Sequence, residues 1–302
     1  MQSFVTQSST IFTGQTTYST GSNPESLKAV DVNGDGKPDI IVANYGSNNV
    51  GVLLNIGNGM FAAQTTYLTG AGPVEVAAAD VNGDGKPDII VANSVSNNVG
   101  VFLNIGNGTF SAQTTYSAGI SPGSVVAPDV NGDGKPDIIV ANFGSNNVGV
   151  LLNIGNGTFL TQTTYSTGTG PSEVAAADVN YDGKLDIIVT NYRSNNVGVL
   201  LNIGNGTFAA QKTYSSGSGP YYVAAADING DDKCDIIVAN LHSNNVGVLL
   251  NIGNGTFAAE ATYSTDSSPA YVVAADVNGD GKSDIIVGNS GSNNIGVFLN
   301  YC

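Results

Sequence analysis

The sequence predicts an all-β fold: a six-bladed β-propeller of four-stranded antiparallel blades, closed into a ring by its N-terminal strand. Three observations support this prediction. The stretch Asp31–Asp39, with the sequence DVNGDGKPD, recurs five more times at steps of 49 residues along the 302-residue chain. Each repeat contains four short β-type segments joined only by turns. One sheet of 49 residues cannot cover both its faces, whereas six equal sheets packed around an axis can.

The repeat from residue 61 to residue 109 shows how each element is predicted. Its strands are expected at Phe61–Tyr67, Val74–Ala79, Asp88–Ala92 and Val99–Leu103. Turn-forming residues separate them, namely Gly and Pro before the second strand, Asn-Asn before the fourth and Asn-Gly after it. No connection is long enough for a parallel crossover, so the sheet is expected to be an antiparallel meander. Alanine dominates the expected innermost strand, which would let six strands crowd near the axis.

The two ends of the chain suggest how the ring closes. Phe12–Tyr18 matches the outermost strand of a blade, and the chain stops at Asn300–Cys302, just after a third strand. We therefore expect the N-terminal segment to complete the last blade. The predicted organisation is an extension at 1–11 and one domain at 12–302, with repeats starting near residues 12, 61, 110, 159, 208 and 257.

The composition excludes several partners. The chain has 24 acidic and 9 basic residues and a formal charge of −15, which disfavours nucleic acids and anionic membranes. No apolar run is long enough for a transmembrane helix, and Met1–Ile11 lacks the features of a signal peptide. A monomer is expected. Cys234 and Cys302 do not make a disulfide framework, and free thiols are favoured over a bridge.

The recurring acidic stretch predicts a calcium loop in every repeat. Oxygen-bearing side chains stand at positions 1, 3, 5 and 9, a spacing that a tight loop can turn onto one hard cation. Position 6 is glycine in five copies, where such a loop turns sharply. Six bound Ca²⁺ ions would carry twelve positive charges and bring the formal charge close to zero. The alternative is six Asn-Gly or Asp-Gly turns with solvated charges.

Several motifs together resemble a known repeat family. They are Asn33–Asn44, with the sequence NGDGKPDIIVAN, the turn Gly70–Pro73, and Gly108–Phe110. They are similar to the FG-GAP or VCBS-type repeats of integrin-α-like propellers and of many secreted microbial proteins. The resemblance covers residues 12–302. It implies a propeller with Ca²⁺ between the first and second strands of each blade, an extracellular or cell-surface location, and a role in binding proteins or glycans.

The family pattern also implies the ligand set: side chains at positions 1, 3, 5 and 9 and the carbonyl of position 7. The residues are Asp31, Asn33, Asp35, Lys37, Asp39; Asp80, Asn82, Asp84, Lys86, Asp88; Asp129, Asn131, Asp133, Lys135, Asp137; Asp178, Asn180, Asp182, Lys184, Asp186; Asp227, Asn229, Asp231, Lys233, Asp235; and Asp276, Asn278, Asp280, Lys282, Asp284. Two loops depart from the pattern. Tyr181 replaces glycine at position 4, and Asp232 replaces glycine at position 6, so the fifth site is expected to be the weakest or most distorted.

Enzyme chemistry finds little support in the sequence. The one histidine, His242, stands in a turn, where an unpartnered imidazole is a poor base. Paired carboxylates would have to come from Glu25, Glu75, Glu173, Glu260 and Asp266, and no motif pairs them. The chain is therefore expected not to be an enzyme.

A ligand-binding face is predicted from the positions at which the six copies differ. These positions gather at two turns expected opposite the calcium loops. In the later repeats the turns carry Tyr192, Arg193, Tyr221, Tyr222, His242 and Tyr271. Tyrosine and arginine favour recognition of a protein or a carbohydrate. Three alternatives remain: neutral drift, a purely structural scaffold, and a lectin with sites between blades. Tyr222 and Tyr271 are also compatible with side chains that fill the space between blades.

Overall fold

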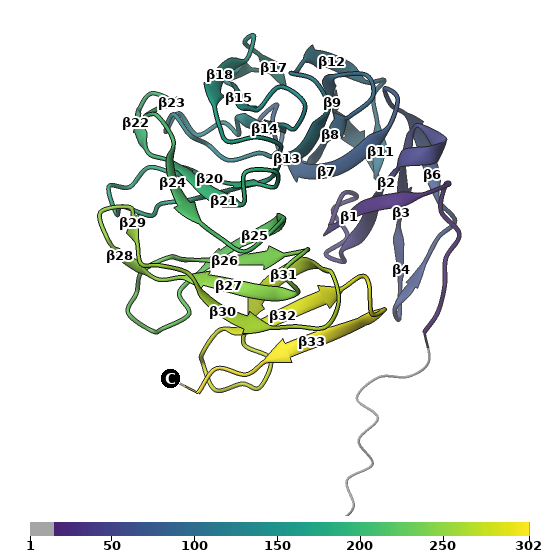
Figure 1. The fold of residues 1–302 in the computed structure, drawn as a ribbon. Helices are drawn as coiled ribbons and strands as arrows, with labels where there is room; N and C mark the ends of the chain where they lie inside the picture. Colours follow the sequence, from purple (N-terminus) through teal and green to yellow (C-terminus); the bar gives the residue numbers. More distant parts are fainter. Residues whose placement is uncertain (1–14, 302) are drawn as a thin grey trace, which may run out of the picture.

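The computed structural model describes residues 15–301, and their fold is almost entirely β (Figure 1). Six sheets, here called blades 1 to 6, follow one another in chain order. The innermost strands are β1 (Pro24–Val30), β7 (Pro73–Ala79), β13 (Pro122–Val126), β19 (Pro171–Ala177), β25 (Pro220–Ala226) and β31 (Pro269–Ala275). The second strands are β2 (Asp39–Asn44), β8 (Asp88–Asn93), β14 (Ile138–Asn142), β20 (Asp186–Asn191), β26 (Asp235–Asn240) and β32 (Asp284–Asn289).

The outer half of each blade repeats in the same way. The third strands are β3 (Asn49–Leu53), β9 (Asn98–Phe102), β15 (Asn147–Leu151), β21 (Asn196–Leu200), β27 (Asn245–Leu249) and β33 (Asn294–Phe298). The fourth strands are β6 (Thr65–Leu68), β12 (Thr114–Ser117), β18 (Thr163–Ser166), β24 (Lys212–Ser215) and β30 (Ala261–Ser264). A short 3₁₀ turn, η1 (Tyr45–Ser47), follows β2.

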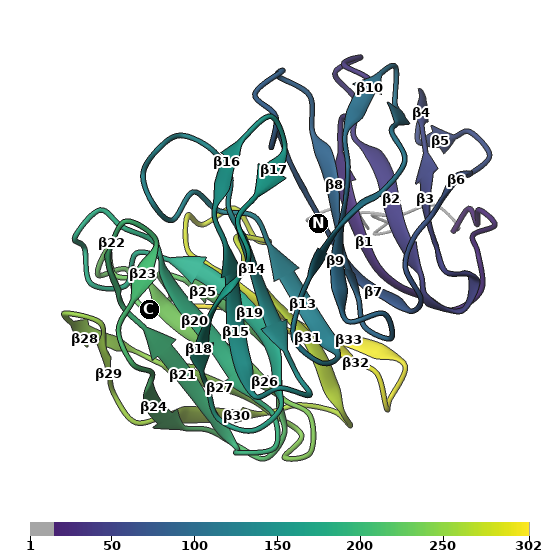
Figure 2. The same ribbon diagram turned by 90° about the horizontal axis from the view of Figure 1, so that it is seen from above.

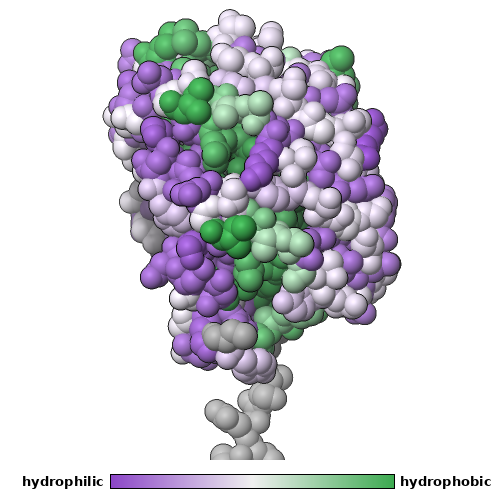
Figure 3. Space-filling view, turned by 60° about the vertical axis from the view of Figure 1, so that its left-hand side comes forward, coloured by the Kyte–Doolittle hydropathy of each residue, from purple (hydrophilic) through white to green (hydrophobic). Residues whose placement is uncertain are grey.

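A two-stranded hairpin projects between the third and fourth strands of blades 1 to 5. The pairs are β4 (Asn55–Gly57) with β5 (Met60–Phe61), β10 (Asn104–Gly106) with β11 (Thr109–Phe110), β16 (Asn153–Gly155) with β17 (Thr158–Phe159), β22 (Asn202–Gly204) with β23 (Thr207–Phe208), and β28 (Asn251–Gly253) with β29 (Thr256–Phe257). Asn107 and Gly108 both have positive φ at one hairpin tip, as a type I′ turn requires. Each hairpin also exposes one isoleucine, for example Ile105. Apolar groups on the side shown in Figure 3 gather in separate patches rather than one continuous surface.

The strands pair antiparallel from the axis outward, as the turns predict. In blade 2, Glu75 stands opposite Ala92, and Ala79 stands opposite Asp88. The register shifts between Pro73 and Glu75 because proline begins the strand with a bulge. The same shift recurs after the proline of every innermost strand, for example in blade 5. The bulge therefore sets which residue after the proline faces the axis in each blade.

The core consists of layers between neighbouring blades, whose broad faces lie against each other (Figure 2). Between blades 2 and 3, for example, Val81 and Ile90 pack with Ile138 and Val140, all buried. The described residues contain five such layers, one for each neighbouring pair from blades 1 and 2 to blades 5 and 6. The second strand is apolar on both faces because it contributes to the layers on both sides of its sheet.

The faces of blades 1 and 6 that would meet in a closed ring are exposed. Leu27 of blade 1 is 61 % exposed, whereas its equivalents in the other blades, such as Val76, are buried. Ile295 of blade 6 is 75 % exposed, whereas Val246 at the same position of blade 5 is fully buried. We call the space between these two faces the seam. Blades 1 to 6 therefore form a propeller-like arc, and the described residues do not close it into a ring.

The prediction that Phe12–Tyr18 supplies the fourth strand of the last blade is wrong for residues 15–18, the part that the structure describes. Within residues 15–301 the last sheet has three strands, and Gln15–Tyr18 form no strand. Residues 12–14 of that prediction lie outside the described residues. Tyr18 instead packs edge-on against Phe61, with ring centroids 5.5 Å apart. Blade 1 therefore holds the segment on one side of the seam, away from the edge of β33.

No helix in residues 15–301 is both long and apolar enough to cross a membrane. Cys234 is a free thiol whose pKa burial raises to about 11, so it is protonated at neutral pH. Cys302 lies outside the described residues.

Candidate functional site

One residue from each innermost strand faces the centre of the arc, and together they form an axial ring. They are Ser26, Glu75, Ser124, Glu173, Tyr222 and Tyr271, spaced by 49 residues and placed two positions after each proline. All except Ser124 line one cavity of about 320 Å³, here called the axial pocket. Ser124 is fully buried beside it. The bulge after the proline lets two successive residues of an innermost strand reach the cavity, as Glu25 with Ser26 and Tyr221 with Tyr222 do.

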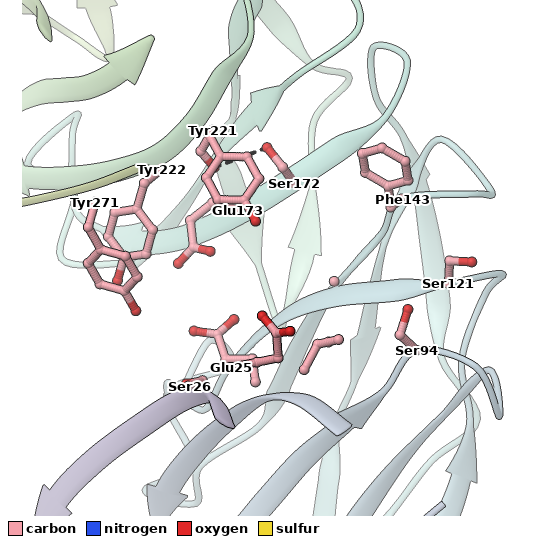
Figure 4. A pocket seen from close by; sticks show the side chains of 13 residues that line it. Glu25, Ser26, Ser94, Ser121, Phe143, Ser172, Glu173, Tyr221, Tyr222 and Tyr271 are labelled. Atoms are coloured by element: carbon pink, nitrogen blue, oxygen red, sulfur yellow. Dashed lines mark hydrogen bonds between the residues drawn. The ribbon is translucent and has the colours of Figure 1, made fainter. Parts of the chain in front are cut away.

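The axial pocket combines aromatic rings with carboxylates: Glu173 lies beside the tyrosines, and Glu25 lies across the cavity from them (Figure 4). Glu25, Glu75 and Glu173 supply three carboxylates, and Tyr221, Tyr222, Tyr271 and Phe143 supply the rings. Serines 26, 94, 121 and 172 complete the polar part of the wall. Figure 4 shows the labelled Glu25 and Glu173 carboxylates directed toward the cavity from different strands. This combination of rings and convergent polar groups is typical of a small-ligand site.

Glu75 and Glu173 form a buried acid pair. They are only 6 % and 9 % exposed. Glu75 accepts a hydrogen bond from the backbone N–H of Val125 at 3.1 Å, and the hydroxyl of Ser124 lies within hydrogen-bonding reach of both carboxyl groups. Burial raises the pKa of Glu75, and burial together with the negative charge of Glu75 raises the pKa of Glu173 well above its ordinary value. The two carboxyl groups therefore keep their protons to a higher pH than exposed glutamates do.

Two tyrosines face this acid pair. The rings of Tyr222 and Tyr271 are stacked, with centroids 4.0 Å apart and planes 28° from parallel. Burial and the charge of Glu173 raise the pKa of Tyr222, so its phenol stays neutral and can donate a hydrogen bond. Tyr221 is 44 % exposed at the mouth of the pocket. Both tyrosines line the axial pocket, and Tyr222 also packs against the core layer between blades 5 and 6, as the alternative of side chains between blades predicted.

The other three predicted ligand residues form a cluster beside the pocket. The hydroxyl of Tyr192 lies 2.7 Å from Nε2 of His242, and the guanidinium of Arg193 lies 4.6 Å from the centre of the Phe143 ring. Tyr192 also packs edge-on against Tyr221, at 6.1 Å between centroids. The six predicted residues thus gather on one face, three in the pocket and three at its rim, and His242 is not an unpartnered histidine.

The expectation that nothing pairs the free carboxylates is wrong for Glu75 and Glu173. No sequence motif joins residues 98 positions apart, but the 49-residue period places them at the same position of two different repeats. This shared repeat position could have been seen in the sequence. It predicts that the two carboxylates are close only once the position is known to face the axis. Glu25 joins the same pocket. Glu260 instead accepts a hydrogen bond from Asn240 within blade 5, and Asp266 accepts one from Asn294 in blade 6.

The six acidic loops share one geometry. In the first, the carboxylate of Asp31 accepts backbone N–H bonds from Gly34 and Gly36 at 2.8 and 2.7 Å, and these bonds lower its pKa. Asp39 is fully buried and accepts the N–H groups of Val32 and Asn55 at 2.9 and 2.7 Å. Asp39 therefore ties the loop to the end of the third strand. The corresponding bonds recur in the second loop.

The donor set of these loops fits Ca²⁺, which prefers carboxylate, amide and backbone carbonyl oxygens. Within residues 15–301 no three acidic, His or Cys side chains are grouped as a metal site, so the predicted set would also depend on its asparagine and backbone carbonyl oxygens. In the first five loops the lysine at position 7 is bonded to the aspartate at position 5, as in Lys37 with Asp35 at 2.9 Å. A bound cation would have to draw this aspartate away from its lysine.

The two irregular loops keep the common backbone. Tyr181 and Asp232 have φ of 63° and 61°, the left-handed region that glycine occupies at these positions in other loops. The N–H of Asp232 donates to Asp227 at 2.8 Å, as glycine does elsewhere, so the fifth loop is not visibly distorted. The hydroxyl of Tyr181 contacts the backbone N–H of Cys234 in that loop.

Comparisons with known proteins agree with this fold. The family model described as an FG-GAP-like repeat matches residues 31–91, 80–140, 129–189, 178–238 and 227–287. No curated protein matches the sequence. A solved lectin from Agrocybe aegerita, which recognises non-reducing terminal N-acetylglucosamine, is 25 % identical, with a TM-score of 0.60 over 90 % of this chain and 79 % of the lectin. Virginiamycin B lyase from Staphylococcus aureus is 14 % identical, with a TM-score of 0.65 over 92 % and 82 %, a likeness of fold alone.

Proposed function

Because the chain belongs to the family of proteins built from FG-GAP-like repeats, we propose that it is a non-catalytic recognition module that binds a carbohydrate in the axial pocket. One observation carries the proposal: the positions at which the six repeats differ converge on one cavity with stacked tyrosines and buried carboxylates. Tyrosine faces stack on the apolar side of a sugar ring, and carboxylates accept its hydroxyl protons. The similarity to a sugar-binding lectin supports this choice of ligand.

The composition of the pocket wall limits the chemistry that it could support. Its lining residues include no histidine, cysteine or lysine, so the carboxylates of Glu75 and Glu173 are the main candidates in it for a catalytic acid and base. A peptide is the alternative ligand, and a purely structural role is the alternative function.

A glycan array and a peptide pull-down would test the proposal. We expect the wild-type protein to retain a sugar ligand, and Tyr271→Ala and Tyr221→Ala each to weaken binding about tenfold or more. Tyr263→Ala is the matched control, because Tyr263 is 48 % exposed, much like Tyr221, but lies on β30, the outer strand of blade 5. Equal affinity in all four proteins would place the site elsewhere, for example between blades. A lack of binding on both assays would favour the structural role.

We also propose that Ca²⁺ stabilises the fold, held by positions 1, 3, 5 and 9 and the carbonyl of position 7 of each loop. A bound Ca²⁺ would offset the repulsion of three aspartates in each loop. Without the bidentate glutamate of an EF-hand, the affinity should suit the millimolar calcium outside cells, and we therefore propose an extracellular or cell-surface location.

A thermal melt tests the calcium proposal. Binding to the native state at a hundred times Kd adds about 2.7 kcal/mol per site, so millimolar Ca²⁺ should raise Tm by many degrees over EDTA. Magnesium is the control, since it keeps its waters and should act weakly. Coincident melts with Ca²⁺ and EDTA would contradict the proposal.

Finally, we propose that blades 1 and 6 meet in solution as a closed, monomeric six-bladed ring. Apolar side chains such as Leu27 and Val297 are exposed at the seam, and their equivalents are buried in every other blade. Deleting residues 1–11 should change little, whereas deleting 1–18 should remove the Tyr18 contact and promote self-association. Size-exclusion chromatography with light scattering separates the two outcomes. Identical elution of both truncated proteins would show that the Tyr18 contact does not protect the seam from self-association.

A further inference from the structure

The axial pocket has no positively charged residue among those that line it. Its wall contains three glutamates, three tyrosines, a phenylalanine and several serines. Lys28, on β1, is the cation whose charge acts on both Glu75 and Glu173, but it does not line the cavity. An anionic ligand would therefore meet carboxylates with no cation in the cavity wall, which disfavours phosphates, sulfates and carboxylates as the group bound here.

The acceptors in the pocket exceed the donors offered to them. An ionised carboxylate has about four acceptor positions. Glu75 receives the N–H of Val125, and the side chain of Glu173 has the Ser124 hydroxyl in reach, which it shares with Glu75. A hydroxyl has one proton and can serve only one of them at a time. In addition, the Ser26 oxygen of the same axial ring is buried and has no hydrogen-bond partner within residues 15–301.

We propose that the axial pocket binds the protonated amino group of a small polar ligand, with Glu173 and Glu75 as its acceptors and the Tyr222–Tyr271 stack beside it. An ammonium group supplies three hydrogen-bond donors and one positive charge, which are what the acid pair lacks. The face of a tyrosine ring also attracts a cation. A cavity of about 320 Å³ suits an amine-bearing monosaccharide or a single amino-acid side chain.

This inference rests on the proposed recognition function and narrows its ligand. Calorimetric titrations at physiological ionic strength would use glucosamine, N-acetylglucosamine and Nα-acetyl-lysine amide as probes. Glucosamine should bind at least tenfold more tightly than N-acetylglucosamine, because acetylation removes the charge and two of the donors. Binding of the lysine derivative as well as glucosamine would show that the ammonium group itself is recognised. Binding of glucosamine but not of the lysine derivative would show that the recognised ammonium group belongs to an amino sugar.

The decisive variant is the double substitution Glu75→Gln with Glu173→Gln, which keeps the side-chain shape and removes both charges. Its affinity for glucosamine should fall at least tenfold. The matched control is Glu260→Gln with Asp266→Asn, which removes two charges away from the pocket. Gln already occupies the position of Glu260 in the other repeats, for example Gln211. The control should bind like the wild type, which separates the pocket from general attraction to an acidic chain.

Two results would overturn the inference. One is equal affinity for glucosamine and N-acetylglucosamine, and the other is unchanged glucosamine binding in the double glutamine variant. If both sugars bind equally and Tyr271→Ala abolishes both, the recognition function stands and only the amine inference fails. If no probe binds the wild type at millimolar concentration and the glycan array is also blank, both fail.

Discussion

The layer between blades 4 and 5 and the seam between blades 6 and 1 contain equivalent residues in different surroundings. Between blades 4 and 5, Val197 and Val223 are buried in one core cluster. At the seam, Ile295 takes the position of Val197 and Leu27 takes that of Val223, and both are exposed. Because the repeats are nearly identical, the difference arises from the missing neighbour and not from the side chains. A blade therefore forms its sheet locally, but its faces are buried only when another blade packs on them.

Tyr18, in the N-terminal segment, makes at the seam a contact that also occurs in the inner layers. The Tyr18 hydroxyl donates to the carbonyl of Gly59 at 3.3 Å, as Tyr116 does to Gly157 and Tyr214 does to Gly255, both at 3.1 Å. Tyr18 thus occupies the position that the outer strand of a preceding blade would give it. One side of the seam is already organised for a neighbour, while β31–β33 on the other side are not packed against it.

The largest expected effect comes from the phenylalanine at the hairpin of each interface. Phe208→Ala should lower the free energy of unfolding by about 3–5 kcal/mol, because Phe208 is buried against Tyr165 in the layer between blades 3 and 4. Phe61→Ala should cost only about 1–2 kcal/mol, because Phe61 is half-buried and faces the seam. Urea unfolding measures both. Equal losses would mean that the seam is packed like the inner layers.

A smaller effect on stability is expected for a valine on the third strand of blade 5, in the layer between blades 5 and 6. Val246→Ala removes a fully buried side chain and should cost roughly 2 kcal/mol. Ile295→Ala, at the same position of blade 6, should cost about as much if the ring is closed in solution, as proposed above. A change of about 0.5 kcal/mol or less would show that the seam stays open and would contradict closure.

The smallest effect concerns the acid pair, which belongs to blades 2 and 4, away from the seam. The raised pKa of Glu173 means that the folded state binds a proton more tightly than the unfolded state. Stability from this group is therefore full below the ordinary pKa of 4.5 and is lost as the pH rises through the folded pKa. Glu173→Gln should be more stable than the wild type at pH 8, on the order of 1 kcal/mol, and the difference should vanish near pH 4.

Thermal melts across this pH range would measure the difference. The other titratable groups around the pair are Glu25, Lys28, Tyr221, Tyr222 and Tyr271. Asp266→Asn, which removes a charge away from the pocket, serves as the control. A difference that does not change with pH would contradict a raised pKa of Glu173 in the folded protein.

The sequence by itself determined the blade and the surfaces that vary. The 49-residue period, the Asn-Gly hairpins and the alanine-rich inner strand predicted the strands and their antiparallel order, because turn geometry and side-chain alternation act over a few residues. The same local chemistry fixed the left-handed conformation at position 6 of the loops, which Asp232 adopts in place of glycine. The variable turns also marked Tyr221, Tyr222 and Tyr271, all of which line the pocket.

Only the tertiary structure decided which side chains meet. Glu75 and Glu173 share a pocket because the bulge after each proline turns this position toward the axis, and blade packing brings repeats that are not consecutive together there. The seam could not be predicted from the sequence either, because the residues at its faces match those of the buried layers. Local hydrogen bonding sets the strands, but the angle between successive blades is a sum of many packing contacts, and that sum decides whether the last blade reaches the first.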